Sequence, residues 1–389
     1  MHVVIYTHAF PPMIGGIETI TMELAQRLAM SVQSTSPDAV QVTVVTPRAE
    51  GTANERDLPF RIVRKPSLLQ LVRLVWQADV LHLAGPLMLP LFLGWVFRKR
   101  MVVEHHGFQT ACPNGQFVYL PTQSPCPGHF MAGEFGSCLK CNAGQGMIHS
   151  VKQWFLTYPR RWLCHAASAN VNPTGWLGSV LKLPNMVTIP HGLSKPACKG
   201  VASPRTASRP VIAFLGRLVS AKGVHVLLEA AHQLLDLDFE LKIIGDGPER
   251  VVLEAKADNL GLKDHVKFLG FLDQSGVEKV VSGTIAVVMP SLGGEVFGLA
   301  ALENMRRGKL VIVSEIGALT EVVGDTGLTF PAGDAKALAN RLRRALQPDG
   351  FAEKMGSRAI SRALSTFSAA QMAEGHMALY RLVASSPAA

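Results

Sequence analysis

Short apolar segments rich in β-branched residues alternate with helix-forming segments along most of the chain, and this alternation limits the possible folds more than any other feature. In the first half, strand-like segments lie at residues 2–7, 40–47, 78–83, 101–105, 169–172 and 186–189. Buried parallel strands have this composition, and their alternation with helices is typical of a doubly wound α/β domain. The sequence therefore predicts a parallel sheet with helices on both faces.

The alternation stops at residues 194–209, where Pro, Ser and Lys are frequent, and it restarts from residue 211. Such an aperiodic stretch is typical of a linker, and a chain of 389 residues is longer than one hydrophobic core usually supports. We therefore expect one α/β domain over residues 1–195 and a second over residues 206–367. Residues 368–385 have helical periodicity and would form a last helix.

The segment PSLGGEVFGLAALENMRR, at residues 290–307, combines a strand end, two glycines and a helix start. The residues that would open this helix are Val296, Phe297, Gly298 and Leu299. Their unpaired backbone N–H groups would form a phosphate-binding helix N-terminus. Glu303, inside the helix, could accept hydrogen bonds from a ribose, and Glu295 could hold sugar hydroxyls. Two glutamates at this spacing are common in themselves, so the interpretation depends on the strand–glycine–helix context.

The segment FLGRLVSAK, at residues 214–222, ends a strand at Gly216 and then places Arg217 and Lys222 on a loop. A planar guanidinium and a compact ammonium suit a diphosphate, although an isolated pair of cations on a turn is more often only solvated. Further glycines that permit a tight turn between a strand and a helix lie at Gly15, Gly16, Gly245 and Gly247. The loops after these strands are therefore candidates for phosphate binding.

Together these segments resemble retaining glycosyltransferases of family 4, and the resemblance covers nearly the whole chain. It implies the GT-B fold, in which two doubly wound Rossmann-like domains face a cleft and the last helix packs back on the first domain. By this resemblance the first domain binds the acceptor and the second binds a nucleotide sugar. Arg217 and Lys222 would hold the leaving diphosphate, Glu303 the ribose and Glu295 the sugar. The nucleotide would also contact Gly15, Gly16, Gly216, Gly245, Gly247, Phe268 and residues 296–299, with the base recognised by backbone groups near Phe268.

His105 and His106 end a strand-like segment, MVVEHHGF, at residues 101–108. Adjacent residues of a strand point to opposite faces, so at most one of the two faces a ligand. From the residues alone, a histidine satisfied within the core is the better interpretation. The family resemblance places His106 beside the donor sugar and leaves His105 outside the site.

Cys112, Cys126, Cys138 and Cys141 lie in a Gly- and Pro-rich insertion at residues 110–145. The two-residue spacing of the last pair is typical of metal chelation, and four thiolates can complete a tetrahedral structural zinc site. An iron–sulfur cluster and thiols without metal are the alternatives, whereas an intracellular chain disfavours disulfides. The resemblance implies that catalysis itself requires no cofactor or divalent metal, so zinc here would be structural.

The basic residues are unevenly distributed along the chain. Residues 1–209 contain 19 Lys and Arg against 9 Asp and Glu, whereas the remaining residues contain 19 against 20. A basic first domain fits an anionic membrane surface or an acidic acceptor, and no nucleic-acid-binding module is recognisable. The apolar residues 87–97 are too few to span a membrane. They form either a buried helix or an interfacial one that ends in Arg98, Lys99 and Arg100.

We therefore expect a retaining glycosyltransferase that moves a sugar from a nucleoside-diphosphate sugar to a hydroxyl of a glycan or lipid-linked glycan. Because no secretory signal is recognisable, we expect it in the cytoplasm, with peripheral contact to the inner face of the membrane. Two other classes remain open. One is a sugar-nucleotide-binding GT-B protein without catalysis, and the other is a different GT-B enzyme, such as an epimerase or phosphorylase.

Overall fold

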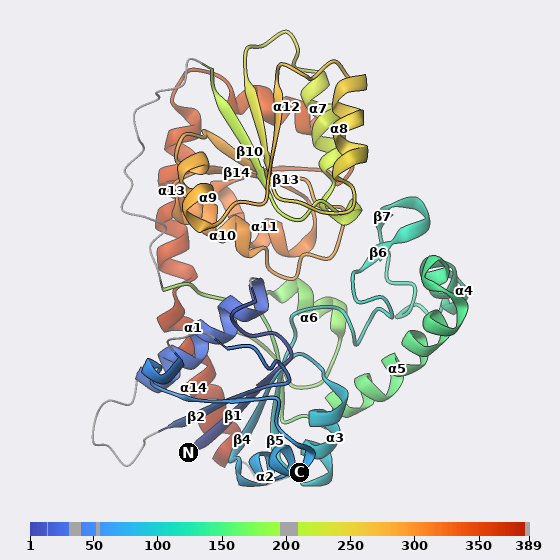
Figure 1. Cartoon of the computed structure of the whole chain (residues 1–389), viewed down its shortest axis with the longest axis vertical. Helices are drawn as coiled ribbons and strands as arrows, with labels where there is room; N and C mark the ends of the chain where they lie inside the picture. The colour runs from blue at the N-terminus through green and yellow to red at the C-terminus, as the bar shows by residue number, and fades with distance from the viewer. Residues whose placement is uncertain (14, 31–39, 52–54, 195–208, 386–389) are drawn as a thin grey trace. The chain divides into compact units, whose positions relative to one another are not determined.

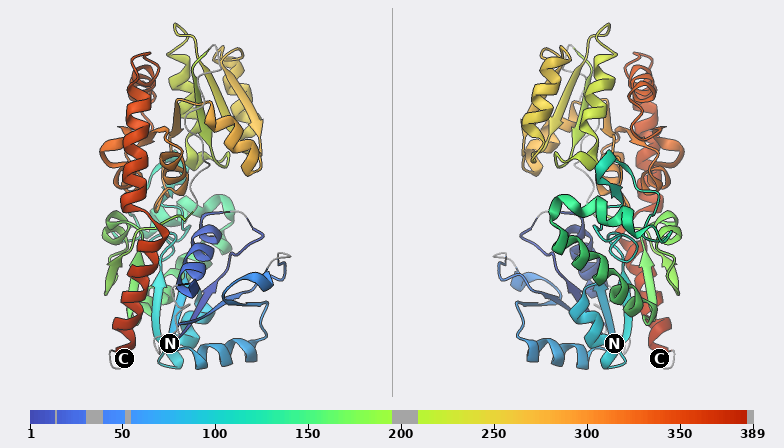
Figure 2. Two further views of the ribbon diagram at one scale, coloured as in Figure 1. Left: turned by 90° about the vertical axis from the view of Figure 1, so that its left-hand side faces the viewer. Right: turned by 90° about the vertical axis from the view of Figure 1, so that its right-hand side faces the viewer.

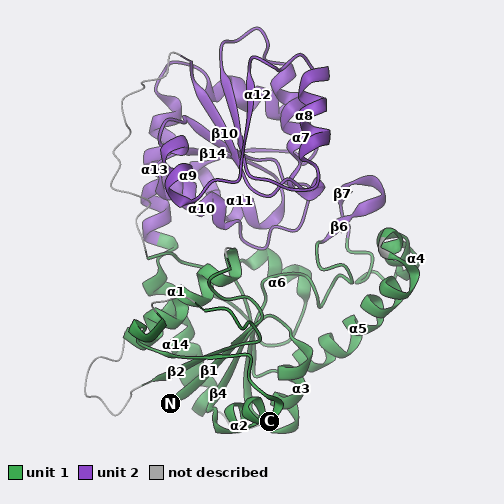
Figure 3. Ribbon diagram, in the orientation of Figure 1, with its two compact units in different colours: residues 1–116, 128–194, 366–389 green, residues 117–127, 195–365 purple. Residues whose placement is uncertain are grey.

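The computed structural model describes residues 1–13, 15–30, 40–51, 55–194 and 209–385. Most of the expected linker and Cys198 lie outside the described residues. The chain divides into two compact units (Figure 3). Unit 1 comprises residues 1–116, 128–194 and 366–389, and unit 2 comprises residues 117–127 and 195–365.

Unit 1 contains a parallel seven-stranded sheet (Figure 1) with the strand order β3-β2-β1-β4-β5-β8-β9. The strands are β1 His2–Thr7, β2 Gln41–Thr46, β3 Arg61–Arg64, β4 Val80–Ala84, β5 Arg100–Glu104, β8 Ala169–Asn172 and β9 Met186–Thr188. Every residue of β4 is buried, as expected for a central strand that is covered on both faces.

The helices of unit 1 are α1 Gly16–Met30, α2 Leu68–Gln77, α3 Met88–Val96, α4 Phe135–Asn142, α5 Met147–His165, α6 Gly175–Leu181 and α14 Ala369–Ser385. The last helix, α14, lies beside α1 and against β4 and β5 (Figures 1 and 2). Its buried face carries His376 and Tyr380 together with smaller apolar residues. The end of the chain therefore contributes side chains to the core of unit 1.

Unit 2 contains a parallel six-stranded sheet with the strand order β12-β11-β10-β13-β14-β15. The strands are β10 Val211–Leu215, β11 Glu240–Ile244, β12 Val266–Gly270, β13 Ala286–Met289, β14 Leu310–Ser314 and β15 Leu328–Phe330. The helices are α7 Val224–His232, α8 Arg250–Asn259, α9 Gln274–Ser282, α10 Leu299–Arg306, α11 Gly317–Val323, α12 Ala335–Ala345 and α13 Phe351–Thr366. Both units are thus Rossmann-like, as the sequence predicts.

We expected residues 110–145 to form one insertion of the first domain, but they do not. Residues 117–127 belong to unit 2, where β6 Val118–Tyr119 and β7 Ser124–Pro125 pair as an antiparallel hairpin. The reason is contact with unit 2: a Cβ atom on Gly293 would lie 2.4 Å from Val118 Cγ2, and Ser220 donates a hydrogen bond to Gln123. The insertion therefore contributes structure to both units.

Among the described residues, no helix combines the length and the apolar character that crossing a membrane requires.

Candidate functional site

Each sheet reverses its strand order at one point, between β1 and β4 in unit 1 and between β10 and β13 in unit 2. Ligands of open parallel sheets bind outside the carboxyl ends of the strands at such a point. Arg217 and Lys222 follow β10, and Glu295 follows β13. The predicted diphosphate and sugar contacts therefore come from the two loops that flank the reversal in unit 2.

Lys222 and Glu295 form an ion pair between these two loops. Glu295 is 8% exposed, and Ser291 Oγ donates a hydrogen bond of 2.8 Å to Glu295 Oε1. Because a carboxylate with two such partners has a fixed orientation, the ion pair joins the loop after β10 to the loop after β13. Arg217 lies on the same loop as Lys222 and is exposed to solvent.

Gly245 and Gly247 bring a third loop, after β11, against the loop after β10. A Cβ atom on Gly245 would lie 1.9 Å from the carbonyl oxygen of Gly216, and one on Gly247 would lie 2.3 Å from that of Leu218. The backbone N–H of Leu218 also donates to Asp246 O over 2.9 Å. Glycine is required at both positions because no side chain fits between the two backbones.

Helix α10 begins beside these loops. Its N-cap, Gly298, has a φ of +89°, a conformation that favours glycine. Phe297 is 1% exposed and anchors the turn, whereas Val296 and Leu299 are partly exposed. Burial raises the pKa of Glu303, whose Oε2 lies 3.7 Å from Arg307 Nη1. Glu303 is thus a partly exposed acid on the second turn of α10, paired with Arg307 of the same helix.

Phe268 lies on β12, where it is paired with Ile243 of β11. Its side chain packs against the hydrophobic core of unit 2. A contact of this position with a nucleotide base would therefore come from its backbone and not from its ring.

Unit 2 also contains an Asp-x-Asp pair, Asp236 and Asp238, which our sequence analysis overlooked. Both residues precede β11 and so lie at the amino ends of the strands, opposite the edge that carries Arg217 and Lys222. Asp236 accepts hydrogen bonds of 2.6 and 2.9 Å from Arg343, and Asp238 pairs with Arg209. Asp236 and Asp238 therefore form ion pairs with arginines at the amino ends of the strands.

In unit 1, Gly15 and Gly16 lie where β1 connects to α1. A Cβ atom on Gly15 would lie 2.5 Å from Glu18 Oε2, and Gly16 is the first residue of α1. The Glu18 carboxylate in the first turn of α1 is itself buried. The buried Glu18 side chain therefore lies close to Gly15 and leaves little room for a side chain there.

His105 and His106 have different partners. His105 is fully buried, and its Nε2 lies 2.9 Å from Asn170 Oδ1. Burial lowers the pKa of His105 to about 4, so this imidazole is neutral at pH 7. The His106 ring stacks on His191, with ring centroids 5.2 Å apart, and His106 Nε2 lies 3.5 Å from Glu104 Oε2. The two histidines thus point to opposite sides of the strand end.

Two neighbours of His106 were missed by our sequence analysis as functional residues. Glu104 precedes His106 by two residues, so the two-residue period of a strand could have revealed it as a neighbour on the same face. His191 follows β9 in the segment Pro190-His191-Gly192, and its Nδ1 lies 3.5 Å from Glu104 Oε1. Only the fold brings His191 to this strand end.

Two of the four cysteines are connected through the side chain of Asn114. Cys112 Sγ donates to Asn114 Oδ1 over 2.9 Å, and Asn114 Nδ2 donates to Cys141 Sγ over 3.2 Å. Cys138 is buried on α4, and Cys126 lies in the residues assigned to unit 2. In the described part of the chain, the sets of three or more potential ligand atoms within 4.8 Å of one another contain no cysteine. Zinc at these four cysteines stays a prediction.

Comparison with known proteins gives one matching family model. Residues 202–362 match the family described as glycosyl transferases group 1. Curated relatives include a phosphatidyl-myo-inositol mannosyltransferase of Mycobacterium leprae, which is 31% identical over 235 residues that cover 58% of each chain. The D-rhamnosyltransferase WbpZ of Pseudomonas aeruginosa is 35% identical over 183 residues, which cover 46% of this chain and 47% of WbpZ. The matched segments span about half the length of these relatives.

Solved structures resemble the chain over nearly its whole length. Sucrose-phosphate synthase from Thermosynechococcus elongatus has a TM-score of 0.72 at 20% identity, and the match covers 99% of this chain and 100% of that one. HepE of Anabaena, solved in complex with UDP and glucose, has a TM-score of 0.72 at 18% identity and 99% coverage of both chains. The chain therefore has the GT-B fold, and its residues 202–362 are similar to the glycosyl transferases group 1 family.

Proposed function

We propose that the chain is a retaining glycosyltransferase that moves a hexose from a nucleoside-diphosphate sugar to an acceptor hydroxyl. The observation that carries this proposal is the meeting of Lys222, Glu295 and Ser291 at the strand reversal of unit 2. A sugar-binding acid and a phosphate-binding cation side by side suit a ligand in which a sugar adjoins a diphosphate. The group 1 family match supports the same assignment.

In this proposal Arg217, Lys222 and the N-terminus of α10 stabilise the negative charge that develops on the departing diphosphate. Glu295 positions the sugar, and Glu303 accepts hydrogen bonds from the ribose. His106 orients the donor sugar. Retention would follow from a front-face substitution in which a donor phosphate oxygen helps to deprotonate the acceptor, so no protein nucleophile is needed.

UDP-glucose is the first donor to test, because HepE was solved in complex with it. Arg217→Ala and Lys222→Ala should each lower kcat/KM roughly 30- to 1,000-fold, equivalent to about 2–4 kcal/mol of transition-state stabilisation. Lys279→Ala is the matched control, since Lys279 is an exposed cation on α9 of the same unit. If none of a panel of nucleotide sugars supports transfer or slow donor hydrolysis, the binding protein without catalysis becomes the better assignment. We call Arg217 and Lys222 the diphosphate clamp. Near-normal turnover by both variants would refute this role.

We further propose that unit 1 docks on an anionic membrane from the cytoplasmic side and that the acceptor is lipid-linked. Support comes from exposed apolar side chains on α2, α3 and α5, which we call the aromatic surface. They are Trp76, Leu89, Phe92, Trp95, Val96, Met147, Ile148, Phe155 and Trp162. Ring contacts connect the three helices: Trp76 with Phe97 at 5.6 Å and Trp95 with Trp162 at 5.1 Å. Exposed apolar patches often mark interaction sites, and aromatic rings favour the membrane interface.

Cations border the aromatic surface. Arg73, Arg98 and Lys152 are exposed, and Lys99 lies over the Trp76 ring at 5.7 Å from its centroid. Each Lys or Arg near an anionic leaflet contributes about 1 kcal/mol, and the contribution falls with salt. Helix α3 has one buried side and one exposed side. It buries Pro90, Leu91 and Leu93 and exposes the opposite side. The relative from Mycobacterium leprae is named phosphatidyl-myo-inositol mannosyltransferase. This name refers to a phospholipid and supports a lipid-linked acceptor.

Co-sedimentation with vesicles tests the docking. The protein should bind vesicles that contain anionic lipid, bind zwitterionic vesicles poorly, and release as ionic strength rises. Phe155→Ser should weaken binding, whereas Phe271→Ser should not, because Phe271 has a similar exposure (69% against 66%) but lies in unit 2. Absence of binding to anionic vesicles at low salt would direct the search to a water-soluble acceptor.

A further inference from the structure

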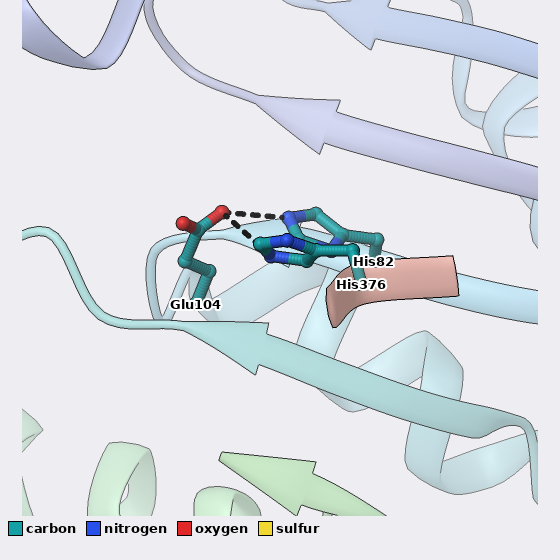
Figure 4. A group of neighbouring side chains, drawn as sticks. All are labelled: His82, Glu104 and His376. Carbon is teal, nitrogen blue, oxygen red and sulfur yellow. Dashed lines mark hydrogen bonds and ion pairs between the residues drawn. The ribbon is translucent and has the colours of Figure 1, made fainter. Parts of the chain in front are cut away.

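A cluster of buried titratable side chains joins the last helix to the sheet of unit 1. His82 lies in β4, Glu104 ends β5, and His376 lies in α14. Their side chains are 1%, 2% and 0% exposed. Figure 4 shows both imidazole rings turned toward the Glu104 carboxylate. Three segments that are far apart in the sequence thus place ligand-type atoms together in the interior.

The ligand atoms of these three side chains all lie within 4.8 Å of one another. Glu104 Oε2 lies 3.1 Å from His82 Nε2 and 3.8 Å from His376 Nε2. A tetrahedral metal site with bonds of about 2.1 Å places its ligand atoms about 3.4 Å apart. The two observed separations lie on either side of that value, so small movements would accommodate an ion.

His376 makes a hydrogen bond on the side of its ring that faces away from Glu104. This bond determines which ring nitrogen carries the proton and which has a lone pair. His376 Nδ1 lies 2.9 Å from Met372 O. A carbonyl oxygen only accepts, so Nδ1 must carry the proton in that bond. A histidine that binds a metal ion does so as the neutral ring, in which the other nitrogen, Nε2, carries no proton. The Nε2 atom then presents a lone pair to a carboxylate, and it is buried without a hydrogen-bond partner. Two electron-rich atoms at this distance repel each other unless a cation lies between them.

His82 also has a hydrogen-bond partner on the ring nitrogen that faces away from Glu104. Its Nδ1 lies 2.8 Å from the hydroxyl of Tyr380 on α14, and that hydroxyl can either donate or accept. Outer hydrogen bonds to a carbonyl and a hydroxyl are the usual means of orienting histidines that bind metals.

We propose that His82, Glu104 and His376 bind a divalent first-row transition metal, for which zinc is the best match. Imidazole nitrogen and carboxylate oxygen are typical zinc ligands, whereas magnesium and calcium prefer oxygen alone. The ion would neutralise the buried carboxylate and would tie α14 to β4 and β5. Its role would thus be structural, and its loss should destabilise unit 1.

Metal analysis tests the site in the full chain, produced without a polyhistidine tag or chelators. We expect about one zinc ion per chain bound at this site after incubation with equimolar Zn²⁺ and gel filtration, with a higher thermal midpoint than the chelator-treated protein. Cobalt loading identifies the ligands, because nitrogen and oxygen ligands give d–d absorption without the intense thiolate-to-metal band that cysteines produce. No retained metal, or a cobalt spectrum from thiolates alone, would overturn the proposal.

Variants locate the ion. His376→Gln should abolish binding, and Tyr380→Phe, which keeps the shape of the core, should lower affinity about 10- to 100-fold. His149→Gln is the matched control, because His149 is exposed on α5 of the same unit. Cys138→Ser with Cys141→Ser separates this site from the cysteines and should leave the binding at His376 intact. Unchanged affinity in Tyr380→Phe and His376→Gln would assign the metal elsewhere and refute the site.

Discussion

Gly223 controls how closely two loops of the candidate donor site approach each other. It follows Lys222 directly, has a φ of +65°, and would place a Cβ atom 1.9 Å from the carbonyl oxygen of Pro290. Pro290 begins the loop that carries Ser291 and Glu295. The absence of a side chain at Gly223 therefore allows Lys222 to reach the acid on the neighbouring loop.

Gly223→Ala should destabilise the protein by at least about 2 kcal/mol, because a positive φ and a backbone clash act together. It should also raise the KM for the donor by separating Lys222 from Glu295. Gly261→Ala is a matched control, since Gly261 has a φ of +70° and no atom within 4 Å of the added Cβ. Its cost should be about 1 kcal/mol. Equal losses of stability and donor binding in the two variants, measured by denaturant unfolding and kinetics, would show that the clash with Pro290 is unimportant.

Single residues differ in how far the sequence could predict their surroundings. The two-residue period of a strand separates His105 from His106, and the structure indeed gives them different partners, Asn170 and Glu104. The partners from distant segments could not be predicted, because His191 and His376 reach Glu104 only through the packing of β9 and α14. Local periodicity holds no information about contacts at such separations.

The hairpin formed by β6 and β7 supports the glycine loop after β13. Val118 is 1% exposed and packs against Gly293, where an added Cβ would lie 2.4 Å from Val118 Cγ2. Gly293→Ala should therefore weaken donor binding by displacing the loop that holds Glu295. Val118→Ala should restore part of that loss in the double variant, with a coupling energy of about 0.5–3 kcal/mol.

Isothermal titration with the nucleoside diphosphate measures this coupling across the four proteins of the cycle. Additive effects would mean that the hairpin does not support the loop. The hairpin itself could not be predicted from sequence, because strands of two residues in a Gly- and Pro-rich segment have no periodicity to detect.

Zinc at Cys112, Cys126, Cys138 and Cys141 is a separate prediction about the insertion. If it is correct, the cobalt-loaded protein should show thiolate-to-metal absorption that Cys138→Ser with Cys141→Ser removes, together with a loss of stability in the first domain. Retention of all metal by the double variant would leave these thiols with a packing role.

Elements with strong apolar runs were predicted best. β1 and β8 have the predicted bounds, and the centre of β1 is the apolar run Val-Val-Ile-Tyr, as is usual for a buried parallel strand. In contrast, β3 is the strand RIVR at a sheet edge, with no fully buried residue, and its charges concealed it. Helix α5 contains Pro159, which argued against a continuous helix of 19 residues.

At the scale of the whole molecule, the two units have separate sheets and separate cores. The alternation of strands and helices on either side of residues 194–209 predicted both sheets. The chain nevertheless passes between the units more than once, since residues 117–127 join unit 2 and residues 366–389 return to unit 1. Our sequence analysis assigned all residues before the linker to the first domain. It therefore did not predict that residues 117–127 belong to unit 2.

Because the proposed diphosphate contacts lie within unit 2, a nucleoside diphosphate should stabilise that unit selectively. A ligand at 100 times its dissociation constant adds about 2.7 kcal/mol to the free energy of unfolding. Calorimetry with UDP should thus shift the unfolding transition of unit 2 upward, by roughly 5–10 °C. Uridine, which lacks the phosphates, should shift it little.

The same experiment with Lys222→Ala assigns the effect to the clamp. This variant should lose most of the UDP-dependent shift, whereas Lys279→Ala should keep it. GDP and ADP test the base independently, since a preference among the three would locate base recognition near the backbone of β12. An equal shift from uridine and UDP would contradict the clamp. It would mean that the base and the ribose provide all the binding energy and that Lys222 and Arg217 contribute nothing to holding the diphosphate.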